Sequence, residues 1–188
     1  MSSPNDIKNG TVIRYEGNLW VVVSFQRVAP GKGGSFVRTR MKNIQTGKVV
    51  ENNFKSSETL EFEDVSYLKM QYLFSDGLMF TFMDTQSYEQ VEISKDLIEE
   101  IIPYLKDGLE VTVSMHEGHA LAATLPKKIE YTIASAPPAV KGDTASGNVT
   151  KEAVMDNGLK VQVPIFIKGG EKILVNTDTG AYSERVNS

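Results

Sequence analysis

A single lysine stands in the stretch APGKGGSF, between two runs of strand-forming residues. The residues that surround Lys32 are one proline and three glycines, namely Pro30, Gly31, Gly33 and Gly34. Three glycines are more than a tight turn requires, but they let the backbone approach another molecule closely. A Walker-type phosphate loop needs Gly-Lys-Ser/Thr at the start of a helix, whereas here a glycine and a strand follow the lysine. The pattern therefore predicts an amine on a bare hairpin tip, a shape suited to insertion into a narrow site.

Further cations lie close to this loop in the sequence. Side chains alternate between the two faces of a strand, so a strand after the loop places Arg38, Arg40 and Lys42 on one face. Arg27 on the incoming arm and Lys55 further along the chain are candidates to join them. Such a row can neutralise phosphates in a salt-dependent way that does not depend on sequence. A solvated outer face of an antiparallel sheet would give the same pattern.

The charge of the chain is unevenly distributed. The net charge at pH 7 is −4, yet residues 8–55 carry nine Lys/Arg against two acids, a balance of +7. Residues 65–128 carry five Lys against ten acids, and residues 129–188 carry six basic against seven acidic groups. This asymmetry indicates a polar molecule whose N-terminal part suits a phosphate-bearing partner.

Other reactive chemistry is hard to find in this sequence. The chain has no cysteine, which excludes disulfides, thiolate nucleophiles and Cys-ligated zinc. His116-Glu117-Gly118-His119 lacks the helical zincin spacing and reads as a hairpin turn. No Ser or Lys has an evident base beside it, so we expect neither an enzyme, nor a metal, nor a cofactor. No apolar run is long enough to cross a membrane, and we expect a cytoplasmic protein.

The elements that would position these residues are almost all strands. Short β-rich segments separated by glycine-containing turns predict an all-β chain of three small barrels, with units at residues 1–64, 65–128 and 129–188. The stretch SKDLIEEIIPYLKDG in the second unit is the one convincing helix, with Ser94 as its N-cap and Gly108 as its stop. Strands with one helix before the last pair are typical of a five-stranded OB barrel.

A series of motifs runs through the whole chain in a fixed order: PGKGGSFVRTR, FMDTQSYEQVEI, GDTAS, VQVPIFI, the segment ending TDTGAY, and Arg185 near the end. In these motifs the chain closely resembles the bacterial elongation factor P family. The resemblance implies an SH3-like (KOW-type) first domain followed by two OB domains, arranged in an L shape. It also implies a monomeric factor that binds both ribosomal subunits between the peptidyl-tRNA and exit sites. Such a factor stimulates peptide-bond formation and relieves stalling at consecutive prolines.

The resemblance also assigns roles to individual residues. Lys32 matches the loop lysine that a modifying enzyme often extends. By position in the first domain, the basic residues Arg27, Arg38, Arg40, Lys42 and Lys55 would lie against transfer RNA and ribosomal RNA. Gly142, Asp143 and Thr144 match a loop near the messenger RNA of the exit site, and Tyr182 and Arg185 match residues that face the small subunit.

Two departures from the family pattern bear on this assignment. Gly34-Ser35 stand where a polar residue and Ala are frequent, which leaves the modification of Lys32 open, and Glu152 stands where Pro is frequent. Two other functions remain as alternatives: an elongation factor P-like paralogue, which would differ in the stalling sequences it relieves, and a general single-stranded RNA-binding OB protein, which would bind free RNA without regard to ribosomes.

Overall fold

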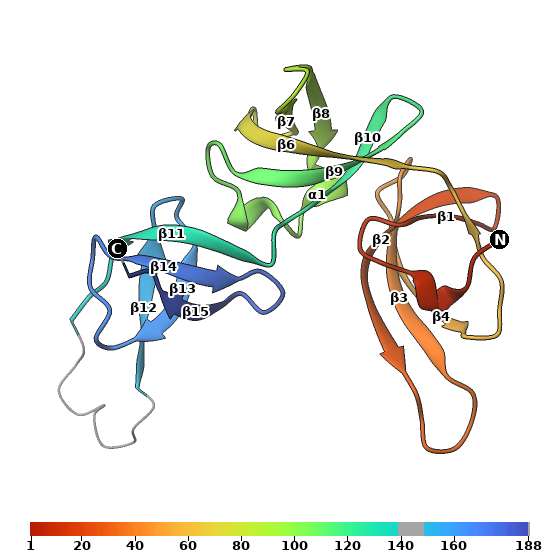
Figure 1. Cartoon of the computed structure of the whole chain (residues 1–188), viewed down its shortest axis with the longest axis horizontal. Helices are drawn as coiled ribbons and strands as arrows, with labels where there is room; N and C mark the ends of the chain where they lie inside the picture. Colours follow the sequence, from red (N-terminus) through yellow and green to blue (C-terminus); the bar gives the residue numbers. More distant parts are fainter. Residues whose placement is uncertain (139–148, 188) are drawn as a thin grey trace. The chain divides into compact units, whose positions relative to one another are not determined.

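Strands dominate the computed structural model, which describes residues 1–138 and 149–187 (Figure 1). The first sheet contains β1 (Val12–Tyr15), β2 (Asn18–Val28), β3 (Phe36–Asn43), β4 (Val49–Lys55) and β5 (Glu61–Phe62). The second contains β6 (Ser66–Ser75), β7 (Met79–Asp84), β8 (Gln90–Ser94), β9 (Glu110–His116) and β10 (His119–Thr124). The third contains β11 (Lys128–Ser135), β12 (Thr150–Met155), β13 (Lys160–Pro164), β14 (Lys172–Asn176) and β15 (Ala181–Arg185). The predicted all-β fold class is confirmed.

The first sheet has the strand order β4-β3-β2-β1-β5, with antiparallel neighbours. Its tightest turn joins β1 to β2 through Glu16 and Gly17, whose φ angles of 50° and 76° are those of a left-handed hairpin turn. Alternate residues of the strands point inward, and Ile13, Val37 and Phe54 are almost fully buried. A short 3-10 helix at Pro4–Asp6 precedes the sheet, and Ile7 joins the same core.

The second and third sheets share one topology. Their orders are β10-β9-β6-β7-β8 and β13-β12-β11-β14-β15. In each sheet the two outer strands also contact each other, β8 with β10 and β13 with β15, so both sheets curl into barrels. Numbered within its own domain, each barrel runs 1-2-3-5-4 and back to 1, the five-stranded Greek-key arrangement of the OB fold.

The helix of the second barrel is shorter than the sequence predicts. The α-helix α1 covers only Lys95–Ile98, and a 3-10 helix follows at Ile102–Tyr104. Ser94 has the extended backbone of an N-cap, but its side chain makes no capping hydrogen bond. Pro103 lies within the expected span and has no backbone N–H to donate, so a regular α-helix cannot run through it to Gly108.

The chain forms two compact units. Residues 1–100 and 107–124 make up the first, while residues 101–106 and 125–188 make up the second. Within the second unit the short 101–106 segment is firmly held: the Tyr131 hydroxyl donates a 2.5 Å hydrogen bond to the Tyr104 carbonyl, and Asn157 donates to the carbonyls of Pro103 and Leu105. Of the helices in the described ranges, none has the length and apolar character needed to cross a membrane.

Candidate nucleic-acid interface

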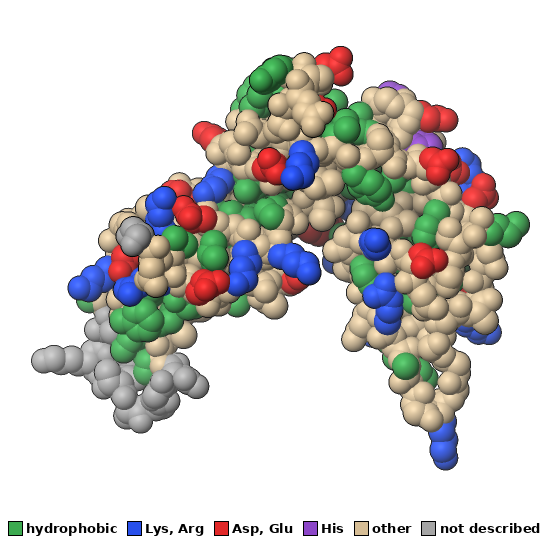
Figure 2. Space-filling model, in the orientation of Figure 1, with side chains coloured by type: hydrophobic (Ala, Val, Ile, Leu, Met, Phe, Trp, Pro, Cys, Tyr) green, Lys and Arg blue, Asp and Glu red, His purple; other side chains and the backbone are tan. Residues whose placement is uncertain are grey.

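The β2–β3 hairpin places Lys32 at its outer end. Pairing between the two strands continues to Val28 and Phe36 and leaves residues 29–35 as the loop. All seven loop residues are exposed. Figure 1 shows the hairpin extending beyond the rest of the first sheet, and Figure 2 shows a cationic side chain at its end. The predicted amine at a hairpin tip is therefore what the structure shows.

The three loop glycines differ in why glycine is suited to each position. Gly33 has φ +109°, a conformation that residues with a side chain rarely adopt. Gly31 and Gly34 have ordinary φ angles, and a Cβ added at either would meet nothing within 4 Å. The fold therefore requires glycine only at Gly33, while the other two keep the surface beside Lys32 free of side chains.

Arg38 and Arg40 form the exposed part of the predicted cationic row. Both lie on the outer face of β3, and Lys55 of β4 is also exposed, opposite Phe36 at the loop end of the sheet. Arg38 has a partly exposed ion pair with Glu51 at 3.6 Å. Arg40 and Lys55 make no ion pair or side-chain hydrogen bond with the described part of the chain. These guanidinium and ammonium groups are free to meet an anionic partner.

The prediction that Lys42 extends this row is wrong. Lys42 is only 1% exposed, and its ammonium lies 3.2 Å from the Glu100 carboxylate, which follows α1 in the second barrel. Strand alternation does put Lys42 on the face of Arg38 and Arg40, but another element covers that end of the strand. Local sequence patterns do not reveal burial by a distant segment, so Glu100 was not predicted as the partner of Lys42 either.

Arg27 lies on the incoming arm β2 and is exposed, as predicted, but it does not share a face with Arg38 and Arg40. It is paired with Val37, so it lies across from a core-facing residue rather than beside the exposed arginines. Its guanidinium donates to the backbone carbonyls of Asn5 at 2.8 Å and Ile7 at 3.4 Å, and it stacks on the Phe25 ring at 4.9 Å. Arg27 therefore fastens the N-terminal segment and does not join the row of Arg38 and Arg40.

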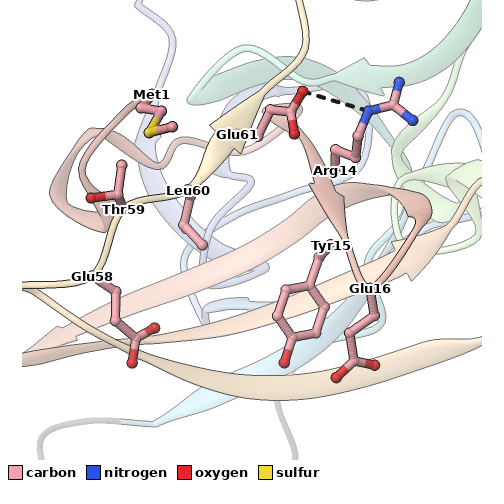
Figure 3. A pocket seen from close by; sticks show the side chains of 8 residues that line it. All are labelled: Met1, Arg14, Tyr15, Glu16, Glu58, Thr59, Leu60 and Glu61. Atoms are coloured by element: carbon pink, nitrogen blue, oxygen red, sulfur yellow. Dashed lines mark ion pairs between the residues drawn. The ribbon is translucent and has the colours of Figure 1, made fainter.

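A pocket of about 680 Å³ opens on another part of the first sheet (Figure 3). Its lining includes three carboxylates, those of Glu16, Glu58 and Glu61, against the Arg14 guanidinium and Met1 at the N-terminus. Arg14 is already paired, with Glu63 at 2.6 Å and Glu61 at 3.8 Å. Because the walls carry excess negative charge, this pocket does not suit phosphate and lies outside the candidate interface.

The predicted C-terminal site residues are only partly described. Tyr182 is half-buried and Arg185 is exposed, both on β15. Arg185 pairs with Glu171 at 3.3 Å. The pKa of Glu171 is lowered, first by the Lys168 backbone N–H that donates to its carboxylate and then by Arg185. Gly142, Asp143 and Thr144 lie outside the described residues.

Three family models match the chain in order and without overlap. The elongation factor P KOW-like domain matches residues 3–60, the elongation factor P OB domain matches residues 65–123, and the elongation factor P C-terminal domain matches residues 129–185. The chain belongs to the elongation factor P family. It is thus a translation factor that acts with the ribosome, rather than an enzyme, and its KOW-like domain is the one that carries Lys32.

Solved structures of related factors are similar over part of the chain. Eukaryotic translation initiation factor 5A from Methanococcus jannaschii is 26% identical with a TM-score of 0.40, covering 66% of this chain and 91% of its own. A translation initiation factor eif-5a family protein from Naegleria fowleri ATCC 30863 is 17% identical with a TM-score of 0.34, covering 66% of this chain and 96% of its own. At these TM-scores the likeness carries no argument beyond the family match.

Proposed function

We propose that this elongation factor P family member binds the ribosome between the peptidyl-tRNA and exit sites and stimulates peptide-bond formation at consecutive prolines. Lys32 on its bare hairpin tip is the observation that supports this role most strongly. The exposed Arg38, Arg40 and Lys55 would contact transfer RNA or ribosomal RNA near the acceptor end of the peptidyl-tRNA. The factor would work in the cytoplasm as a monomer.

The proposed mechanism needs no acid–base group in the factor. Proline restrains φ and stiffens the nascent chain, so the peptidyl-tRNA end is poorly placed for reaction. Holding the reactants in a productive orientation can contribute several kcal/mol to lowering a barrier, on the order of 7–11 kcal/mol when the placement is ideal. An amine reaching in from a glycine-cleared loop can supply such a restraint without steric conflict. A modifying enzyme that extends Lys32 would lengthen the reach of this amine.

Through Tyr182 and Arg185 of its third sheet, the factor would meet the small subunit. The segment of Gly142, Asp143 and Thr144 would lie near messenger RNA in the exit site. These assignments follow the family resemblance in residue type and position. The net acidic second barrel would disfavour RNA and leave RNA contact to the basic first domain.

The decisive experiment compares Lys32→Ala with Lys48→Ala, a matched change of another exposed lysine in the same domain. Both proteins are purified from the native host, so that any modification is in place, and added to reconstituted translation of a Pro-Pro-Pro message. Each variant should change the free energy of unfolding by less than about 0.5 kcal/mol, because both side chains are exposed. Lys32→Ala should abolish stimulation and Lys48→Ala should retain it. Full stimulation by Lys32→Ala would contradict the proposal.

A further inference from the structure

The buried ion pair between Lys42 and Glu100 lies where the first sheet meets the second barrel, inside one compact unit. The Lys42 ammonium contacts both carboxylate oxygens of Glu100, at 3.2 and 3.3 Å. The Lys42 side chain is 2% exposed and the Glu100 side chain 32% exposed. A buried ammonium needs such a partner, because an unpaired buried charge is strongly unfavourable. The pair therefore fixes one residue of β3 against the second barrel in a directional way.

Neighbouring contacts show that this is a close-packed joint. Val21, which pairs with Lys42 in the sheet, belongs to an apolar cluster with Leu121 and Ala122 of β10. In the β3–β4 turn, Gly47 has φ +70°, and a Cβ there would lie 3.3 Å from the Cβ of Asp96 in α1. Apolar contacts of this kind bury area but are not directional. The ion pair adds the fixed geometry that they lack.

The same strand carries Lys32 at its far end. β3 runs from Phe36, at the base of the loop, to Asn43, one residue beyond Lys42. At ~3.3 Å per residue, the base of the loop is about 20 Å from Lys42. A rotation of about 10° at the joint would then move the loop by ~3.5 Å, while a misplacement of ~1 Å can already cost about 100-fold in a reaction that depends on orientation. A small rotation about Lys42 therefore produces a large displacement of the loop that carries Lys32.

We propose that Lys42 and Glu100 are positioning residues, whose buried ion pair sets the orientation of the Lys32 hairpin on the second barrel. This inference rests on the proposed function, because orientation matters only if Lys32 acts at a defined point. It replaces the predicted RNA-binding role of Lys42 with an indirect one. RNA binding by Lys42 and positioning by the ion pair lead to different expected results when Glu100, rather than Lys42, is changed.

The first test measures orientation in the free protein, so it does not depend on any ribosomal activity. The chain has no cysteine, and spin labels at N53C in β4 and Q86C in the β7–β8 turn report the distance between the two sheets. Lys42→Met keeps the apolar stem and leaves Glu100, which is partly exposed and can be hydrated, so this variant should fold. It should broaden the distance distribution at least twofold. Glu110→Gln, which breaks the exposed Lys69–Glu110 pair, is the control and should leave the distribution unchanged. An unchanged distribution in Lys42→Met would overturn the proposal.

The second test separates positioning from RNA contact. Under the proposal, Lys42→Met and Glu100→Gln both lower the maximal rate of Pro-Pro bond formation, about tenfold or more at saturating factor, with little change in the half-saturating concentration. Glu100→Gln leaves the buried Lys42 ammonium without its counter-charge and destabilises the protein, so its rate is measured below its unfolding transition, where circular dichroism shows a folded chain. If Lys42 instead contacts RNA, Glu100→Gln frees its ammonium and tightens ribosome binding, while Lys42→Met weakens it. Opposite effects of the two variants would refute positioning. If Lys32→Ala stimulates translation as fully as the parent protein while the spin-label result holds, the proposed function is wrong. The role of the Lys42–Glu100 pair in orienting the hairpin is then still supported.

Discussion

Arg40 offers a clean test of the cationic face, because nothing in the described residues uses its guanidinium. It lies exposed on β3, opposite Glu51 in β4 but without an ion pair to it. Arg40→Gln should therefore leave the fold intact, with a change in the free energy of unfolding below about 0.5 kcal/mol. Any loss of ribosome binding can then be attributed to a lost contact between Arg40 and the ribosome or its transfer RNA.

The size of the loss follows from counterion release. Each phosphate contact contributes a slope of about −0.7 to −0.9 in a plot of log affinity against log salt concentration. A contact that adds nothing at 1 M salt therefore strengthens binding about five- to eightfold at 0.1 M salt. Losing that contact costs ~1 kcal/mol of binding free energy at 0.1 M. Arg38→Gln should lose less than Arg40→Gln, because Arg38 already shares its charge with Glu51 at 3.6 Å.

The assay is equilibrium binding of labelled factor to ribosomes carrying peptidyl-tRNA, repeated at several salt concentrations. Arg27→Gln is the contrasting variant, since it breaks hydrogen bonds to the Asn5 and Ile7 carbonyls. It should lower stability by about 1–2 kcal/mol and leave the salt slope of the folded protein unchanged. Arg40 does not contact phosphate if Arg40→Gln keeps the parent slope, and Arg27 does contact it if Arg27→Gln reduces the slope without losing stability.

Three further predictions concern the two OB barrels. Tyr131→Phe should lower the free energy of unfolding by about 1–2 kcal/mol in denaturant, because the Tyr104 carbonyl loses its donor; an unchanged midpoint would show that this bond adds nothing. Gly180→Ala should cost about 1–2 kcal/mol in the same assay, since φ is +70° and the new Cβ would lie 2.9 Å from the Tyr104 hydroxyl, and a neutral result would contradict that strain. Backbone N–H donors lower the pKa of Asp76 and of Asp84 below the ordinary value of 3.8, so their contribution to stability is present above that value and is lost as pH falls through the lowered pKa. Titration of the two side-chain carboxyl groups followed by carbon-13 NMR checks both lowered pKa values, and an ordinary pKa for either carboxyl would be the contrary result.

Much of the fold could be read from local sequence, because hairpins depend on local rules. The hairpin turn at Glu117-Gly118 was predicted from sequence, and both residues have positive φ. Alternation in β3 correctly separated the buried Val37 and Thr39 from the exposed arginines. Lys32 was predicted at the tip for the same reason, since loop composition and flanking strands suffice to place it.

The errors arose where distant segments meet. Strand alternation cannot reveal that Glu100 covers Lys42, because the two residues are far apart in the sequence. Arg27 was placed on the correct strand, but its separation from the row of Arg38 and Arg40 was not predicted, because its bonding partners are backbone carbonyls of the N-terminal segment, which side-chain patterns do not encode. One error was local instead: the helix after Ser94 was predicted to reach Gly108, although Pro103 lies within that stretch.

A cryo-EM map of this factor on a ribosome stalled at consecutive prolines would show directly where Lys32 lies during the reaction. We expect continuous density for residues 29–35 at the acceptor end of the peptidyl-tRNA, with the Lys32 amine closest to the terminal nucleotides. A map in which the first domain is bound but this loop points into solvent would contradict this expectation.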